Sequence, residues 1–135
     1  MQKSAFKPHA HTPAFDDSAL NSLNTRYLNV DELPWMDTPY KGIKMKILLK
    51  DESSGLMTAL FQWEAGARLP LHEHVNIEQS YVIEGSLSDS EGECKSGHFA
   101  WRPAGSQHDA WSKEGCLVLA FLLKPNKFLE GPDAN

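Results

Sequence analysis

The sequence has only two cysteines, Cys94 and Cys116, and they are not spaced as a CxxC pair. Two thiols are too few for the disulfide framework of a small secreted domain, so we predict a cytoplasmic protein in which both are reduced. The longest wholly apolar run, residues 116–123, is far shorter than the roughly 20 residues of a membrane-spanning helix. No apolar segment follows the basic residues at the N-terminus, so no secretory signal is predicted.

Positive charge is also scarce. The sequence has 13 basic and 18 acidic residues, which gives a formal net charge of −5 at pH 7. No net positive field attracts nucleic acid or anionic lipid, so we expect neither nucleic acid nor membrane as a partner. The 135 residues are about one domain's length, and a hydrophobic content of 41% excludes a wholly disordered chain.

The chain divides near residue 24. Residues 1–24 mix polar, small and proline residues without a clear period, and we predict an irregular N-terminal arm with at most one helical turn over residues 18–23. Residues 25–135 are predicted to form the folded domain, which ends in a tail after about residue 124.

Amphipathic helical patterns are missing from the folded part. Residues 43–50 instead alternate apolar side chains with lysines, which predicts a half-buried strand whose lysines face water. Residues 51–55 indicate a turn. Further strands are predicted over residues 56–63, 79–84, 85–88, 93–95, 98–102, 107–111 and 116–123. Short strands at close intervals predict an all-β sandwich or barrel rather than βαβ units.

Histidine provides the candidate chemistry. His72 and His74 are two residues apart, so on an extended strand both imidazoles point to the same face. Glu78 follows within reach of a short bend, and His108 comes from a later strand. Imidazole and carboxylate together suit Fe, Mn, Ni, Cu or Zn. His9 and His11 have the same spacing but no carboxylate at a matching distance, and we interpret them as a solvated pair.

Glycines and a proline frame these residues at fixed spacing. The first block, with five, one, three and six residues between its members, is Gly66, His72, His74, Glu78 and Gly85. The second, with intervals of five, one and two residues, is Gly97, Pro103, Gly105 and His108. Both blocks resemble the two signature motifs of the cupin superfamily, except that Ser112 stands where the second motif ends in Asn. The resemblance implies a single-domain double-stranded β-helix, or jelly-roll barrel, with His72, His74, Glu78 and His108 as metal ligands in its mouth.

Local strings narrow the resemblance to one branch. They are Trp35 after residues 32–34, and residues 42–46, 61–67, 81–85 and 115–116. Over about residues 27–123 the chain is similar to the cupin domain of ChrR-type anti-sigma factors and to the small acetylacetone and dihydroxyacetophenone dioxygenases. For the dioxygenases, the resemblance implies mononuclear Fe(II), three His ligands with Glu78 bound or unbound, and cleavage of a C–C bond beside a carbonyl in a small dicarbonyl or hydroxyketone.

The alternative is a non-catalytic sensory or ligand-binding module in which Zn(II) takes all four side chains and leaves no open position. The arm has no Cys and is too short for the zinc-binding helical domain of ChrR-type anti-sigma factors, so we expect no sigma-factor binding of that kind. A stand-alone sensor or a non-redox isomerase stays open. Fe(II) is the expected metal, with Zn(II) next and Mn(II) or Ni(II) as further options.

Supporting residues follow from their positions beside the motifs. Gln79, Tyr81 and Arg102 are candidates to hydrogen-bond a ligand histidine or a substrate oxygen. Cys116 lies on a strand that can face the cavity, without an assigned role. An aromatic wall or an ordinary core is expected from Phe61, Trp63, Phe99, Trp101, Trp111 and Phe121. The resemblance also implies a homodimer, with the strand faces near residues 56–63 and 117–123 as its interface.

Overall fold

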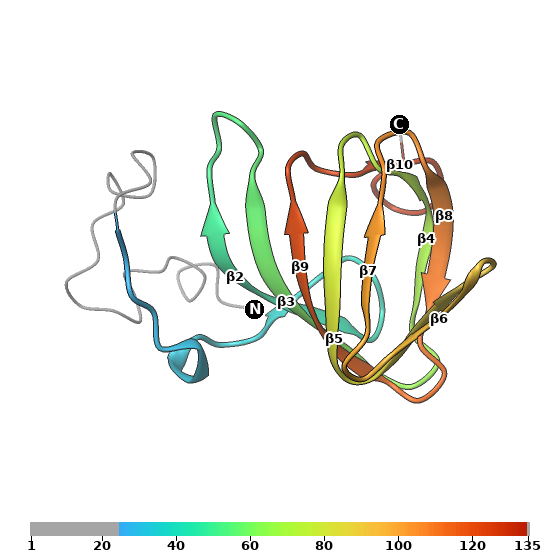
Figure 1. Ribbon diagram of the computed structural model, residues 1–135, viewed down its shortest axis with the longest axis horizontal. Coiled ribbons are helices and arrows are strands. Elements are labelled where there is room, and N and C mark those ends of the chain that lie inside the picture. Colours follow the sequence, from blue (N-terminus) through green and yellow to red (C-terminus); the bar gives the residue numbers. More distant parts are fainter. Residues whose placement is uncertain (1–24, 135) are drawn as a thin grey trace.

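The computed structural model describes residues 25–134, which form one curled antiparallel sheet (Figure 1). The one helix among these residues is the short 3-10 turn η3, Val30–Glu32. The all-β prediction is confirmed. The predicted arm, with its His9 and His11 pair and its helical turn, lies outside the described residues. No helix in the described part of the chain is long and apolar enough to cross a membrane.

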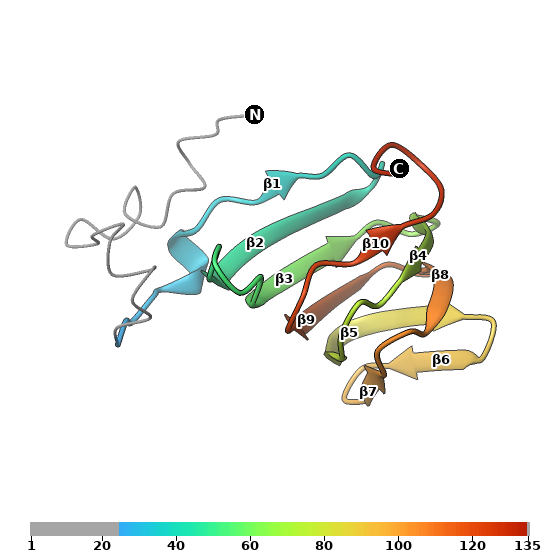
Figure 2. The same cartoon turned by 90° about the horizontal axis from the view of Figure 1, so that it is seen from above.

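Ten strands make up the sheet. They are β1 (Met36–Asp37), β2 (Ile43–Lys50), β3 (Met57–Trp63), β4 (Arg68–Glu73), β5 (Glu78–Asp89), β6 (Gly92–Lys95), β7 (Phe99–Arg102), β8 (Gln107–Trp111), β9 (Cys116–Leu122) and β10 (Lys127–Phe128). Hydrogen-bonded neighbours follow the path β1-β2-β3-β9-β5-β8-β4-β10, while β6 and β7 pair with β5. The sheet curls so that the turn after β1 lies beside the chain that follows β10 (Figure 2). This curl leaves the jelly-roll interior lined by alternate residues of the strands.

Residues 79–84 and 85–88, predicted as two strands, belong to the single long strand β5. A register shift lies between Val82 and Glu84, and Gly85 follows with φ of 76°. A Cβ atom at Gly85 would overlap the backbone carbonyl of Gly115, so the close approach of β5 to the start of β9 requires glycine here. Strand β5 therefore bends and joins both halves of the barrel.

The prediction that the lysines of β2 face water is wrong for Lys46. Lys44 and Lys50 are exposed, but Lys46 is only 7% exposed. Its Nζ atom donates to the carbonyl of Val30 at 2.9 Å and lies 4.8 Å from the centre of the Trp35 ring. The segment before β1 covers this side of β2, and alternation along β2 could not reveal that cover.

Two further positions differ from a simple reading of the sequence. Ser112, where the motif has Asn, is fully buried, and its Oγ atom donates to the carbonyl of Ser86 at 2.6 Å. The backbone of Ser112 also bonds to Gly66 and Ala67, so it connects the chain before β4 with the end of β8. The residues after about 124, predicted as a tail, contain β10, which pairs with β4.

Candidate metal centre

Three histidine side chains converge on one point of the barrel interior. One ring nitrogen from each of His72, His74 and His108 lies within 4.8 Å of the others. His72 belongs to β4 and pairs across the ladder with His108 of β8. His74 follows β4 directly, and the His72 and His74 ring centres are 5.0 Å apart. The i, i+2 spacing thus places both rings on one face, as the sequence predicts.

The loop between β7 and β8 fixes the chain at His74. The His74 amide donates to the carbonyl of Ser106 at 2.9 Å, and the Gly105 amide donates to the carbonyl of His74 at 2.7 Å. Gly105 has φ of 90°, in the left-handed region that favours glycine. The second motif therefore places His108 and also holds the backbone of the first motif.

Hydrogen bonds set the tautomers of two of the rings. Nδ1 of His72 lies 2.8 Å from the carbonyl oxygen of Pro70, and Nδ1 of His108 lies 2.9 Å from Oδ2 of Asp89. Although burial alone would raise it, the pKa of the Asp89 carboxyl is lowered by the Glu91 amide, by Arg102 and by His108. A carbonyl and an ionised carboxylate only accept, so both Nδ1 atoms donate and both Nε2 atoms keep a lone pair. This is the usual arrangement of metal-binding imidazoles.

The nitrogen positions fit a shared metal ion. Nε2 of His74 and Nε2 of His108 are 2.9 Å apart. Two nitrogen ligands at about 2.0–2.1 Å from one ion, at about a right angle, are separated by about 3 Å. Nδ1 of His74 is buried without a hydrogen-bond partner and lies 3.4 Å from Glu78 Oε1, so it can carry the proton of this ring while Nε2 keeps a lone pair. The three-histidine cluster can therefore hold a metal ion.

Glu78 occupies a different place from the three histidines. Its Oε1 atom lies 3.4 Å from Nδ1 of His74, whereas the nitrogen of that ring that faces His108 is Nε2. The carboxylate is not part of the group of ligand atoms that lie within 4.8 Å of one another. Burial raises the pKa of Glu78 to about 7, against the opposing effect of Arg102. The structure thus brings Glu78 to the edge of the cluster, where it can receive a hydrogen bond from His74.

Burial keeps the imidazoles neutral. Burial is the main cause that lowers the pKa of His72. Burial, together with the neighbouring His72 and His108, lowers the pKa of His74 to about 3. Burial and then Arg102 lower the pKa of His108 to about 4. Neutral imidazole is the form that binds metal, so protons do not compete for these nitrogens near pH 7.

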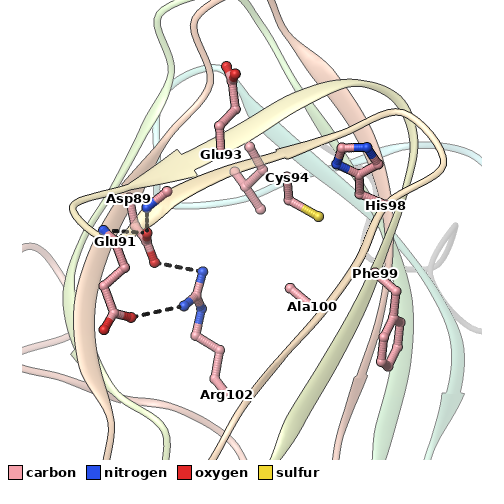
Figure 3. A pocket seen from close by; sticks show the side chains of 10 residues that line it. Asp89, Glu91, Glu93, Cys94, His98, Phe99, Ala100 and Arg102 are labelled. Carbon is pink, nitrogen blue, oxygen red and sulfur yellow. Dashed lines mark hydrogen bonds and ion pairs between the residues drawn. The ribbon is translucent and has the colours of Figure 1, made fainter.

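The cluster lies on the wall of a cavity of about 450 Å³. His72, Glu78 and His108 line it together with mainly apolar side chains from both halves of the barrel. Arg102 is the only Lys or Arg among the lining residues that the structure describes. Its guanidinium points to Asp89 at 2.6 Å and to Glu91 at 3.6 Å, beside an outer recess of about 420 Å³ (Figure 3).

The structure separates the other predicted residues into two groups. Arg102 lies in the cavity wall, whereas Gln79 and Tyr81 are exposed on the outer face of β5. Phe61 and Trp63 line the cavity; Trp111 does not, and Phe99, Trp101 and Phe121 are exposed on the outside. Cys116, which the sequence placed on a strand that can face the cavity, packs in the core. The other cysteine, Cys94, lines the cavity.

Sequence reasoning missed three residues near the cluster. Asp89 bonds to His108, while Tyr40 and Phe128 line the cavity. Asp89 lies between the strands predicted over residues 85–88 and 93–95, and Phe128 belongs to the predicted tail. An apolar aromatic inside a polar tail is the signal that could have identified Phe128, because a solvated tail does not need one.

The fold is shared with several solved cupin structures. An RmlC-like cupin protein from Ralstonia eutropha JMP134 superposes with a TM-score of 0.74 at 22% identity, over 84% of this chain and 79% of that one. An acetylacetone dioxygenase from Acinetobacter johnsonii gives a TM-score of 0.74 at 16% identity, over 82% and 83% of the two chains. The Rhodobacter sphaeroides complex of SigE with the anti-sigma ChrR gives 0.59 at 16% identity, over 81% and 68%. At these identities the likeness shows the fold.

No curated protein matches the chain. The family model of the ChrR cupin-like domain matches residues 24–125, which is most of the chain. The match spans both histidine motifs and nearly all of the barrel. The protein therefore belongs to the ChrR cupin-like domain family.

Proposed function

We propose that this protein is a mononuclear Fe(II)-dependent dioxygenase that cleaves a C–C bond beside a carbonyl group of a small dicarbonyl or hydroxyketone. One observation carries the proposal: three neutral imidazoles face one point on the wall of a mainly apolar cavity of about 450 Å³. His72, His74 and His108 would hold the ion, and the cavity beside them would leave room for a substrate with two neighbouring oxygens and for O₂.

Each group of the site has a role in this proposal. His72, His74 and His108 hold the ion through Nε2, while Pro70 and Asp89 keep two of the rings in the correct tautomer. The apolar wall excludes water from the substrate. Fe(II), when bound, supplies the electron transfer to O₂. For a 1,3-diketone, one C–C bond breaks and both oxygen atoms enter the products, a carboxylic acid and a ketoaldehyde, so no external reductant is needed.

A zinc-binding sensory or ligand-binding module is the second candidate. It is favoured by the match to the ChrR cupin-like domain and by the position of Glu78, whose Oε1 atom is 3.4 Å from His74. If the Glu78 side chain turned from Nδ1 of His74 towards the cluster, it would add a fourth ligand, and four protein ligands close a tetrahedral zinc site. In that case the cavity would bind a ligand without catalysing a reaction of it.

Metal content decides between the two. Untagged protein from cells grown with both iron and zinc is analysed by elemental mass spectrometry, and O₂ uptake is then measured with 2,4-pentanedione and with hydroxyketones. About one iron per chain together with O₂ uptake supports the dioxygenase. Zinc that resists chelators, without O₂ uptake, supports the sensory module.

The site itself is tested by a matched pair of variants. His108→Ala removes one ligand and should weaken metal binding by at least an order of magnitude. His98→Ala changes an exposed histidine whose Nδ1 atom accepts from the Lys95 amide, and it should leave metal binding unchanged. Equal metal binding by the two variants would show that the cluster is not the site.

A further inference from the structure

The chain after β9 crosses the open side of the barrel. We call residues 124–134 the C-terminal strap. Its strand β10 pairs with β4, with Phe128 opposite His72. Beyond β10 the amides of Leu129 and Glu130 both donate to the carbonyl of Leu71, at 2.9 and 3.3 Å. The strap is therefore attached by backbone hydrogen bonds to the strand that carries His72.

A side chain from the turn after β1 contacts the other edge of the strap. β1 and β10 are the two ends of the hydrogen-bonded path. Between them, the Tyr40 ring stacks on Phe128 at a centroid distance of 5.0 Å, and the Tyr40 hydroxyl donates to Oδ2 of Asp133 at 2.5 Å. Figure 2 shows the end of the strap beside the turn after β1. Tyr40 thus closes the barrel where strand pairing ends.

Tyr40 is itself well positioned for this contact. Thr38 Oγ1 donates to the carbonyl of Ile43 at 2.7 Å and accepts from the Tyr40 amide at 3.2 Å. The Ile43 amide donates in turn to the carbonyl of Tyr40 at 3.1 Å. This turn fixes the backbone of Tyr40, from which its ring and hydroxyl reach the strap.

Phe128 lies directly against the metal centre. Its ring centre is 5.3 Å from that of His72, and its side chain lines the same cavity. Tyr40, Phe128 and His72 therefore form a continuous series of packed rings from the edge of the barrel to the cluster. A molecule bound at the cluster has Phe128 as one of its neighbouring walls.

We propose that Phe128 is a specificity-determining residue of this cavity and that Tyr40 and Asp133 position it. Its ring limits the size of the group that a bound ketone can carry on the side of His72. The cavity then selects diketones with small substituents over those with an aryl substituent. The inference rests on the proposed function, because that function places the ligand at the three histidines.

The test compares a small and a large probe, 2,4-pentanedione and 1-phenyl-1,3-butanedione. Affinities are measured by calorimetry on Co(II)-loaded and on metal-free protein. The wild type should prefer the small probe, and Phe128→Ala should raise the affinity for the large probe by about tenfold or more relative to the small one. The probe preference of Phe128→Leu should lie between those of the wild type and Phe128→Ala. Lys127→Ala, at the exposed neighbouring position, should not change the preference.

Two conservative variants test the positioning roles in metal-free protein. Both variants keep the stacked rings of Tyr40 and Phe128. Tyr40→Phe removes the hydrogen bond between Tyr40 and Asp133, and Asp133→Asn weakens it. Hydrogen exchange at the Leu129 and Glu130 amides should become faster, and the probe preference should shift towards that of Phe128→Ala. A structural residue that only stabilised the barrel would change global unfolding without changing this preference.

An unchanged probe preference in Phe128→Ala and Phe128→Leu would overturn the inference, as would the absence of binding by either probe to either form of the protein. Iron content and O₂ uptake report on the proposed function separately. A protein that discriminates the probes by size but takes up no O₂ would keep Phe128 as the selective wall and refute the dioxygenase.

Discussion

His108 donates a hydrogen bond from Nδ1 to Oδ2 of Asp89 at 2.9 Å, and Asp89 is almost fully buried. The same carboxylate oxygen lies 2.6 Å from Nη2 of Arg102. Arg102 thus holds Asp89 from one side while Asp89 holds His108 from the other. A carboxylate behind a metal-binding imidazole fixes the ring orientation and raises the basicity of Nε2.

The first prediction concerns this carboxylate. Asp89→Asn should weaken metal binding by about 10–100-fold, because the amide no longer supplies a charged acceptor for both His108 and Arg102. Competition with a chelating dye measures the change. Glu91→Gln is the control, since Glu91 contacts Arg102 from an exposed position and does not reach His108. If Asp89→Asn bound metal as tightly as Glu91→Gln, Asp89 would have no role in orienting His108.

The second prediction concerns pH and Glu78 in the metal-free protein. Burial raises the pKa of Glu78 to about 7 in the folded chain, from about 4.5 when unfolded. The folded state therefore binds the proton more tightly, and this contribution to stability is complete below about pH 4.5 and is lost as pH rises through about 7. Glu78→Gln should raise the melting temperature of chelator-treated protein at pH 8 relative to wild type, with a smaller gain or none at pH 5.

Thermal unfolding at both pH values measures this difference. Glu84→Gln, an exposed carboxylate on the same strand, is the matched control and should change neither melting temperature appreciably. A Glu78→Gln variant with the same gain at pH 5 and pH 8 would show that the buried carboxyl does not titrate between them.

Local patterns in the sequence predict most of the strands and the placement of the histidine pair, although β1, β4 and β10 are not among the predicted strands. The strand predicted over residues 107–111 is β8, and the spacing of His72 and His74 places both rings on one face. These features depend on the geometry of a single extended strand, which needs no knowledge of its neighbours. The fixed glycine spacing then indicates how the two motifs meet.

The contact of Asp89 with His108 could not be predicted from the sequence because β5 is irregular. Glu78, Ser80 and Val82 line the cavity, which predicts even-numbered residues inside. The register shift between Val82 and Glu84 inverts the alternation, so Leu87 lines the cavity and Asp89 reaches His108. Alternation cannot predict a residue beyond a bulge whose position is unknown.

The contact between Tyr40 and Asp133 could not be predicted for a different reason. They are 93 positions apart and meet only because the curled sheet brings its two ends together. No local pattern encodes such a contact. The ligand roles of His72, His74 and His108 stay predictions of the motif, now with a geometry that suits them.

The third prediction concerns the buried lysine of β2. Lys46→Met should destabilise the fold by about 1–3 kcal/mol, because it removes the hydrogen bond to Val30 and the contact with the Trp35 ring. Lys44→Met changes an exposed lysine on the same strand and should stay within about 0.5 kcal/mol of wild type. Urea unfolding compares the two. Equal stabilities would mean that the contacts of Lys46 with Val30 and Trp35 add nothing to the stability of the fold.

The fourth prediction concerns the outer face of β7, β5 and β9. Large apolar side chains gather there with 41–61% of their surface exposed: Tyr81, Phe99, Trp101 and Phe121. Gln79 pairs with both Trp101 and Phe121, and Tyr81 pairs with Phe99, so these side chains are neighbours across the strands. Exposed apolar patches of several hundred Å² mark interaction surfaces. We therefore expect a homodimer through this face, which extends the predicted β9 surface to β5 and β7.

Light scattering after size exclusion tests the dimer at micromolar concentration. Trp101→Glu should convert the dimer to a monomer, because a carboxylate in the centre of an apolar interface is buried without a partner. Tyr27→Glu is the control, since Tyr27 is 89% exposed and belongs to the segment before η3. Metal binding should survive in both variants, because Trp101 lies on the outside of the strand that carries Arg102 on the cavity side. A wild-type monomer at this concentration would refute the dimer, and a Trp101→Glu dimer would move the interface to another face.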